Sequence, residues 1–261
     1  MEKNYQINTF DYHNNYYFIS DEGCFEVSKS ITNDDYQKLN KQYYQKTNSW
    51  LFSYLFEGGT SPRKLPILKC LILDLNGIDT FSKQKILELI NDLIGNMDVL
   101  ELKKMSVCFY YEHLDLNFKD IIDTINNDFY TKIKMYESSK LNTTKPEDFQ
   151  TLFEIYLKYS MSSSRVYTNN STLIIDLANK DTKLMKQLKP LILHNLLHDS
   201  QFEKLIYSLY ENNLNVSKTA QDVFMHRNTI NNKLDTIEKE TGLNIQNFYD
   251  ALALYMLLNF K

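Results

Sequence analysis

The feature that most constrains the fold lies near the end of the 261-residue sequence, where apolar residues recur at helical spacing in short, closely spaced segments. The first predicted helix covers residues 201–211 and ends at two asparagines. Capping side chains from Asn215 onward precede a short helix over residues 218–224, in which the small Ala220 is expected to face the core. Because such short helices are barely stable alone, they must pack together, which predicts an all-helical module over residues 199–261.

A second short helix is predicted from Arg227, after a tight connection through Met225 and His226. Its apolar residues share one side, so Ile230, Leu234 and Ile237 are expected to face inward. Its other side is polar, and asparagine can pair bidentately with adenine while serine and threonine accept either partner. We therefore expect this helix to enter the DNA major groove. The residues predicted to meet base edges are Asn228, Thr229, Asn231 and Asn232.

Phosphate contacts are predicted where helix starts combine free N–H groups with positive charge. Ser217 with Lys218 fits this description at the first helix, and His226 with Arg227 fits it at the second. The full set of predicted DNA-binding residues is Ser217, Lys218, Thr219, His226, Arg227, Asn228, Thr229, Asn231, Asn232 and Lys233.

Charge supports DNA binding only locally. The chain has a net charge of -4 and a pI of about 5.8, so it lacks the overall basic character of many nucleic-acid binders. Residues 201–261 carry six Lys and Arg against seven Asp and Glu, whereas in residues 217–233 three basic residues outweigh one aspartate. Modest, oligomer-dependent binding is therefore expected. On periodicity alone, two short helices joined by a tight turn need have no DNA-related role.

The amino-acid sequence of this segment closely resembles the C-terminal domain of the PucR/CdaR family of bacterial regulators. It resembles a Fis-type helix-turn-helix more distantly. The resemblance is carried by 215–220 (NVSKTA), 224–230 (FMHRNTI), Lys233-Leu234, Ile237-Glu238 and 241–243 (TGL). It extends upstream through 188–191 and downstream through 251–254. It implies DNA binding as a homodimer or larger oligomer, preceded by a degenerate cyclase-like α/β region. This chain departs from the family at Asn231-Asn232, where basic or aromatic residues are usual, and at Lys233, where arginine is frequent.

The beginning of the chain, residues 1–60, is predicted to be a β-meander followed by one long helix. Aromatic and β-branched residues between Tyr5 and Ser30 are divided into three strands by turn sequences. Thr32 or Asn33 can cap an amphipathic helix that runs to Leu55 and is stopped by two glycines.

Residues 61–180 are predicted to form a central α/β regulatory domain, with a helical connector over residues 181–198. Strands are expected at 67–75, 105–111 and 130–136, with helices over 82–94 and from Phe118 to Ile125. Another helix should start near Pro146, and an extended piece follows at 165–167. Together these features predict a multidomain α+β protein whose C-terminal part is an all-α helix-turn-helix.

Nothing in the sequence favours an enzyme, a cofactor or a metal. Phosphate-binding, dinucleotide-binding and nucleophile-elbow motifs are absent, and no Gly-Gly-Asp/Glu-Glu-Phe hairpin occurs near residues 102–112. His194 and His198 lie one helical turn apart without a third ligand or the intervening glutamate of a zinc hydrolase. Strand-end carboxylates at Asp74, Asp79, Glu112 and Asp115 suit a ligand site less well than ordinary solvated ends.

Three widely spaced cysteines, no apolar run of membrane-spanning length and a polar N-terminus predict a cytoplasmic protein without a membrane partner. Our main hypothesis is a bacterial transcription regulator that senses a small molecule or a protein through residues 1–198 and binds double-stranded DNA through 199–261. A second hypothesis is a protein-interaction module whose helix-turn-helix no longer reads DNA. A third is an enzyme with a cryptic site in the central region.

Overall fold

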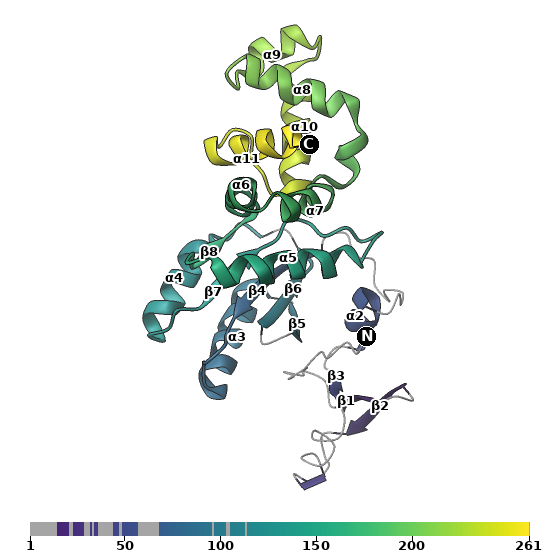
Figure 1. Cartoon of the computed structure of the whole chain (residues 1–261), viewed down its shortest axis with the longest axis vertical. Coiled ribbons are helices and arrows are strands. Elements are labelled where there is room, and N and C mark those ends of the chain that lie inside the picture. Colours follow the sequence, from purple (N-terminus) through teal and green to yellow (C-terminus); the bar gives the residue numbers. More distant parts are fainter. Residues whose placement is uncertain are drawn as a thin grey trace. The chain divides into compact units, whose positions relative to one another are not determined.

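A computed structural model describes residues 15–20, 23–28, 32, 34–35, 44–46, 49–56, 68–95, 97–102, 105–112 and 114–260 of the chain (Figure 1). The chain divides into two compact units. The first contains residues 1–137, 143–147 and 165–167, and the second contains residues 138–142, 148–164 and 168–261. The predicted domain limits at residues 60, 180 and 198 stay a prediction, because the units are interleaved along the chain.

The first unit begins with a small antiparallel sheet in the order β2-β1-β3, followed by helix α2. The elements are β1 (Asn15–Ser20), β2 (Gly23–Ser28), β3 (Tyr44–Lys46) and α2 (Ser49–Phe56). The second and third strands of the predicted meander are confirmed as β1 and β2, whereas the first, expected from Tyr5 to Tyr12, lies outside the described residues. The single long helix up to Leu55 is wrong, because Tyr44–Lys46 pairs with β1 as an edge strand. Tyrosine suits a strand as well as a helix, so the apolar spacing was ambiguous there.

A five-stranded sheet in the order β5-β6-β4-β7-β8 forms the centre of the first unit. Its elements and the helices between them are β4 (Lys69–Asp74), α3 (Thr80–Ile94), β5 (Met97–Leu102), β6 (Met105–Tyr110), α4 (Phe118–Asp128), β7 (Lys134–Glu137) and β8 (Tyr167–Thr168). The pairs β5/β6, β6/β4 and β4/β7 are all antiparallel. From β4 to β7 the chain therefore follows the split β-α-β-β-α-β order. The expected alternation of strands and helices is present, within an α+β rather than a parallel arrangement.

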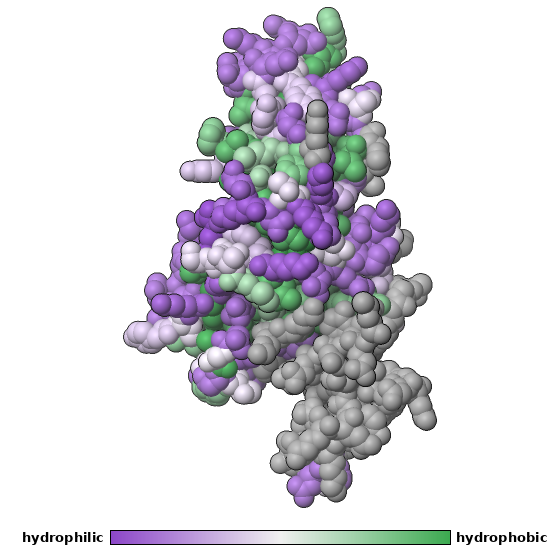
Figure 2. Space-filling model, viewed as in Figure 1, coloured by the Kyte–Doolittle hydropathy of each residue, from purple (hydrophilic) through white to green (hydrophobic). Residues whose placement is uncertain are grey.

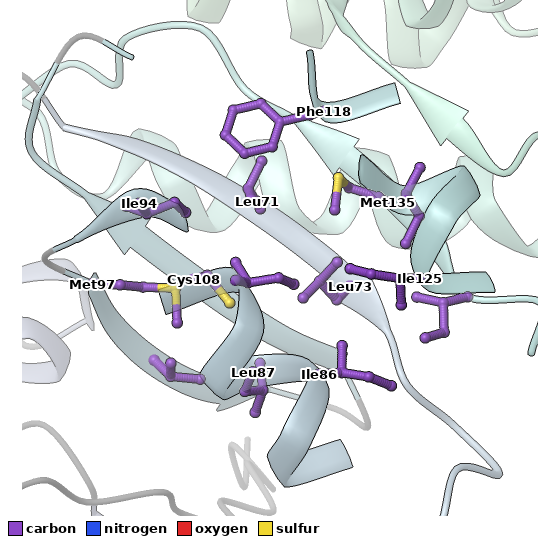
Figure 3. Packing of buried hydrophobic residues seen from close by; sticks show 14 of the residues in the cluster. Leu71, Leu73, Ile86, Leu87, Ile94, Met97, Cys108, Phe118, Ile125 and Met135 are labelled. Carbon is purple, nitrogen blue, oxygen red and sulfur yellow. The ribbon is translucent and has the colours of Figure 1, made fainter. Parts of the chain in front are cut away.

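The hydrophobic core of this unit lies where α3 and α4 cover one face of the sheet (Figure 3). Alternate residues of a strand point to the same face, so Leu71 and Leu73 of β4 both enter this cluster. They pack with Ile86 of α3 and with Ile122 and Ile125 of α4, all fully or almost fully buried. A contiguous cluster of this kind gives the first unit a core of its own.

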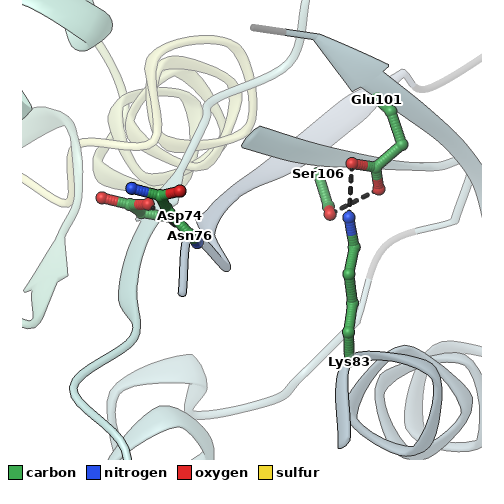
Figure 4. Close-up of polar contacts among 5 residues, drawn as sticks. All are labelled: Asp74, Asn76, Lys83, Glu101 and Ser106. Carbon is green, nitrogen blue, oxygen red and sulfur yellow. Dashed lines mark hydrogen bonds and ion pairs between the residues drawn. The ribbon is translucent and has the colours of Figure 1, made fainter. Parts of the chain in front are cut away.

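A buried polar cluster lies on the same sheet face near the start of α3 (Figure 4). The Lys83 Nζ of α3 lies 2.6 Å from Oε2 of Glu101 on β5, and Ser106 Oγ of β6 donates to Glu101 Oε1 at 2.5 Å. The Glu101 side chain is 5% exposed and that of Lys83 is 18% exposed. Burial raises the pKa of Glu101, and the nearby Lys83 ammonium opposes part of this rise.

The second unit is helical apart from short extended pieces. Its elements are α5 (Asp148–Ser162), α6 (Asn170–Lys180), α7 (Thr182–Leu193), the 3-10 helix η1 (His194–His198), α8 (Ser200–Glu211), α9 (Val216–Asp222), α10 (Arg227–Thr241) and α11 (Phe248–Asn259). Helix α6 was not predicted from the sequence. It packs against α7 and α11. It begins with a capping box in which Asn169 and Thr172 bond reciprocally. Within the part of the chain that is described, no helix is long and apolar enough to cross a bilayer.

Candidate nucleic-acid interface

Helix α8 supports the rest of the C-terminal module. Asp199 caps it by accepting hydrogen bonds from the N–H groups of Gln201 and Phe202. Its inward side carries the expected apolar residues Phe202, Leu205, Ile206 and Leu209, all buried. The supporting helix is therefore confirmed within a residue of its predicted bounds.

Helix α8 also holds α11 in place. Tyr210 Oη donates to the carbonyl of Ala251 at 2.8 Å, and the Tyr210 ring meets Tyr255 edge-on with centroids 5.2 Å apart. Burial raises the pKa of the Tyr210 phenol, so this group remains a hydrogen-bond donor at neutral pH. The contact joins the two ends of the module.

Helix α9 has the predicted start but a different inward residue. Asn215 is its N-cap, with Oδ1 accepting from the N–H groups of Ser217 and Lys218 at 3.1 Å each. Thr219 is fully buried, whereas Ala220 is only half-buried. The prediction that Ala220 faces the core was therefore wrong by one residue, about 100° around the helix axis. Thr219 also leaves the set of predicted DNA contacts, because a buried side chain cannot reach DNA.

The Thr219 hydroxyl offers a direct check of this correction. Among the described residues its Oγ1 has no hydrogen-bond partner, and burial of an unpaired hydroxyl is unfavourable. Thr219→Val keeps the shape and removes the hydroxyl, so we expect the free energy of unfolding to rise by about 1 kcal/mol or stay unchanged. DNA affinity should not change. Urea denaturation together with a DNA titration measures both, and a clear loss of affinity at unchanged stability would contradict the burial.

The turn from α9 into α10 is formed by residues 223–226 and ends at a histidine cap. His226 is the N-cap of α10, and its Nδ1 accepts from the N–H of Asn228 at 3.2 Å. The carbonyl of His226 accepts from the N–H groups of Thr229 and Ile230. In this geometry the ring proton of the neutral His226 side chain lies on Nε2.

These caps limit which backbone N–H groups can contact phosphate. The N–H groups of Ser217, Lys218 and Asn228 already donate to Asn215 or His226, so they are not free for phosphate oxygens. The N–H of Arg227 is not one of these three capped groups, so it stays a predicted phosphate donor beside the charged side chains of Lys218 and Arg227.

Helix α10 presents the expected two sides. Ile230, Leu234 and Ile237 are buried as predicted. Of the predicted DNA contacts, Ser217, Lys218, His226, Arg227, Asn228, Thr229 and Asn232 are exposed, and Asn231 and Lys233 are partly exposed. The start of α10 therefore exposes amide, hydroxyl and guanidinium groups, while the apolar side of the helix is buried. The space-filling view likewise shows a mostly hydrophilic surface around α9 (Figure 2).

The C-terminal end of α10 is fixed by polar contacts with residues far away in sequence. Lys140 Nζ lies 2.6 Å from Glu240 Oε1, and Asn170 Nδ2 donates to the carbonyl of Thr241 at 2.9 Å. Gly242 ends the helix in the left-handed conformation, with a φ of 68°. A Cβ at Gly242 would lie only 3.4 Å from the Cβ of Ser139. No local sequence pattern predicts these contacts.

His194 contacts Lys140, one of the residues that hold the C-terminal end of α10. His194 Nε2 lies 3.1 Å from the carbonyl of Lys140, and burial lowers the pKa of the imidazole. The side chain of His198 lies outside the described residues. No group of three His, Cys, Asp or Glu side chains suited to a metal occurs in the described ranges.

Two of the strand-end carboxylates of the first unit, Asp79 and Asp74, accept hydrogen bonds from nearby backbone N–H groups. Asp79 caps α3 by accepting from the N–H groups of Phe81 and Ser82. Hydrogen bonding to the Ser82 side chain, and then to these N–H groups, lowers the pKa of Asp79. Asp74 accepts from the N–H of Asn76 (Figure 4). Both are turn and cap interactions rather than a converging site.

The geometry of α8 to α10 defines a helix-turn-helix. The seven-residue α9 and the 15-residue α10 are joined by a four-residue turn, α8 supports them, and the start of α10 is exposed and polar. Residues 204–260 match the PucR C-terminal helix-turn-helix domain. This match confirms the resemblance of the segment to the PucR C-terminal domain.

Two further comparisons concern larger parts of the chain. The carbohydrate diacid regulator of Escherichia coli (strain K12) is 28% identical over 105 residues, which are 39% of this chain and 27% of that protein. The chain thus spans about a quarter of the length of this relative. The crystal structure of a regulator of polyketide synthase expression from Bifidobacterium adolescentis aligns over 89% of this chain and 94% of that one, with 13% identity and a TM-score of 0.38. A TM-score of 0.38 supports no conclusion about a shared overall fold.

Proposed function

We propose that the protein is a transcription regulator that binds double-stranded DNA through α9 and α10. The observation that carries this proposal is the exposed start of α10, where Arg227, Asn228 and Thr229 project beside Asn232 from a helix whose apolar side is buried. Short amide and hydroxyl side chains at this place suit base edges in the major groove. The match of this segment to the PucR C-terminal domain supports the same role.

Within this proposal the predicted contacts divide into two kinds. Asn228, Thr229, Asn231 and Asn232 meet base edges. Ser217, Lys218, His226, Arg227 and Lys233 contact the phosphate backbone. Ser217 and Lys218 do so through their side chains, because their N–H groups donate to Asn215. Few positive charges mean few released counterions, so a single module binds weakly. A homodimer that places two copies of α10 about 34 Å apart would raise the affinity through multivalency.

The first unit is proposed to be the signal-sensing part. Its separate hydrophobic core between the sheet and α3 and α4 supports an independent domain. The signal is a small molecule or a protein, and the β-α-β-β-α-β order of the unit is compatible with the degenerate cyclase-like fold expected from the sequence.

A DNA titration tests the proposal. We expect the purified full chain to prefer duplex DNA from upstream of its own gene over a scrambled duplex in fluorescence anisotropy. Binding should weaken as salt rises, because phosphate contacts release counterions. The double variant Arg227→Ala, Asn228→Ala should lose the preference, since both a phosphate and a base contact are removed, at a cost of about 1 to 3 kcal/mol for the base contact alone.

The matched control is Lys239→Ala, which removes an exposed positive charge near the far end of the same helix. It should bind like the wild type. If the wild type does not discriminate between the duplexes at any salt concentration, autonomous DNA reading is wrong. The second candidate function, a protein-interaction module, then becomes the better explanation, and the capped helix starts and the slightly acidic residues 201–261 favour it.

A further inference from the structure

Phe224, in the turn between α9 and α10, has a backbone conformation that phenylalanine rarely adopts. Its φ is 53°, in the left-handed region where a side chain crowds its own backbone. The turn requires this conformation, because the N–H of Met225 donates to the carbonyl of Ala220 at 3.0 Å and the N–H of Phe224 points to that of Gln221 at 3.4 Å. This pair of bonds is the Schellman helix ending, whose left-handed position is usually glycine or asparagine.

Neighbouring helices of the same module use the usual residues at this position. Helix α8 ends with Asn213 in the left-handed conformation, and α10 ends with Gly242. Both residue types tolerate a positive φ better than phenylalanine does. A glycine or asparagine at 224 would therefore satisfy the turn with less strain.

The ring of Phe224 also contributes almost nothing to the core. The residue is 95% exposed, so its side chain buries hardly any apolar surface in the folded chain. Tyr130, after α4, combines the same conformation with 96% exposure, so strain and exposure alone assign no role, and the position of Phe224 in the turn before α10 has to supply one.

The surroundings of Phe224 indicate what the ring contacts. Between Tyr207 and Phe248 it is the one large hydrophobic side chain that the structure describes as exposed. It is only two and three residues from His226 and Arg227, which are exposed and polar. Its neighbours Val223 and Met225 are only partly exposed, so Phe224 is the one fully exposed apolar side chain of this turn. A protein interface normally offers a larger apolar patch, whereas one exposed ring next to a cationic side chain suits the surface of duplex DNA. There it can touch the methyl group of thymine or the apolar face of deoxyribose.

We propose that Phe224 is a DNA-contacting residue of the helix-turn-helix, supplying an apolar contact to a thymine methyl group or a deoxyribose beside the groove that α10 enters. This inference rests on the proposed DNA-binding function. It adds an apolar residue to an interface otherwise predicted from polar and charged side chains.

The test uses Phe224→Gly and Phe224→Asn in the full chain, with duplex DNA from upstream of its own gene as the probe. Both variants fit a positive φ, so the melting temperature should stay unchanged or rise. Affinity for the duplex should fall about tenfold, the size of one good base contact. Lower affinity at equal or higher stability cannot come from misfolding.

Tyr130 provides the matched control. It follows α4, with a φ of 52°, 96% exposure and the same bond from the next N–H, that of Thr131, back to Asn126. Tyr130→Gly should change the melting temperature in the same direction while DNA affinity stays at the wild-type value. A duplex with uracil in place of thymine separates the two contacts: the effect of Phe224→Gly vanishes there if the ring meets thymine methyls and persists if it meets deoxyribose.

Two results would overturn the inference, and they differ. If the wild type prefers its own duplex and the Phe224 variants bind it equally well, Phe224 is not a DNA contact although the proposed function holds. If the wild type fails to bind any duplex, the proposed function fails and the inference fails with it.

Discussion

Ile230→Ala is expected to unfold the C-terminal module locally and abolish DNA binding. Ile230 is fully buried in the first turn of α10, and shortening a buried isoleucine to alanine costs about 2 to 5 kcal/mol through lost burial and the cavity left behind. Helix α9 has only seven residues and cannot compensate by its own propensity. Amide hydrogen exchange in α9 and α10 should accelerate about 30-fold or more, since each 1.4 kcal/mol is a factor of ten.

Asn232→Ala separates stability from recognition in the same helix. Asn232 is exposed, two residues after Ile230, and is a predicted base contact. Hydrogen exchange should remain at the wild-type rate, because exposed substitutions usually change stability by no more than about 0.5 kcal/mol, while DNA affinity falls. If Ile230→Ala left both exchange and affinity unchanged, α10 would not be anchored as the structure has it.

The helices of the C-terminal module were predictable because their signals are local. Caps at Asp199 and Asn215 and the apolar spacing of Ile230, Leu234 and Ile237 all lie within a few residues of the turns they define. The rotation of α9 was predicted wrongly, because Ala220 was expected to face the core where Thr219 does. A seven-residue helix carries too few apolar positions to fix its rotation, so the packing partners decide it.

Elements that depend on distant partners were missed or misread. Strand β5 includes Asp98 and Glu101, and such charges argue against a buried strand until Lys83 and Ser106 are brought beside Glu101 by the fold. The anchor of α10 similarly joins Lys140 to Glu240, 100 residues apart. A single sequence contains no signal for pairings of this kind, because each partner alone resembles an ordinary surface residue.

The structure changes how the predicted residues can contact DNA more than it changes which residues are predicted to do so. Only Thr219 was removed by burial, yet caps from Asn215 and His226 already engage the N–H groups of Ser217, Lys218 and Asn228. Capping residues satisfy the same N–H groups that an anion would need. A sequence that offers both a cap and a positive charge at a helix start therefore does not decide between the two uses.

Lys83→Met is expected to destabilise the first unit by about 2 to 4 kcal/mol at pH 7. The substitution leaves the Glu101 carboxylate buried with Ser106 as its hydrogen-bond donor, and removing one partner of a buried ion pair is strongly unfavourable. We expect a smaller loss in the free energy of unfolding than for a fully buried ion pair, because the Lys83 side chain is 18% exposed and water screens part of the interaction. Lys85→Met is the matched control, since it removes an exposed lysine from the same helix and should have little effect.

The pH dependence of this variant identifies Glu101 as the cause. Burial raises the pKa of Glu101 in the folded wild type, so the native state holds the proton more strongly than the unfolded chain and stability falls as pH rises through this window. Without the Lys83 ammonium the folded pKa should rise further, which deepens that fall and extends it to higher pH. Below the unfolded pKa of about 4.5 the carboxyl is protonated in both states, so most of the penalty should vanish. Urea denaturation of both proteins from pH 4 to pH 8 measures this difference, and a penalty that is the same at every pH would mean that Lys83 acts through packing rather than through its charge.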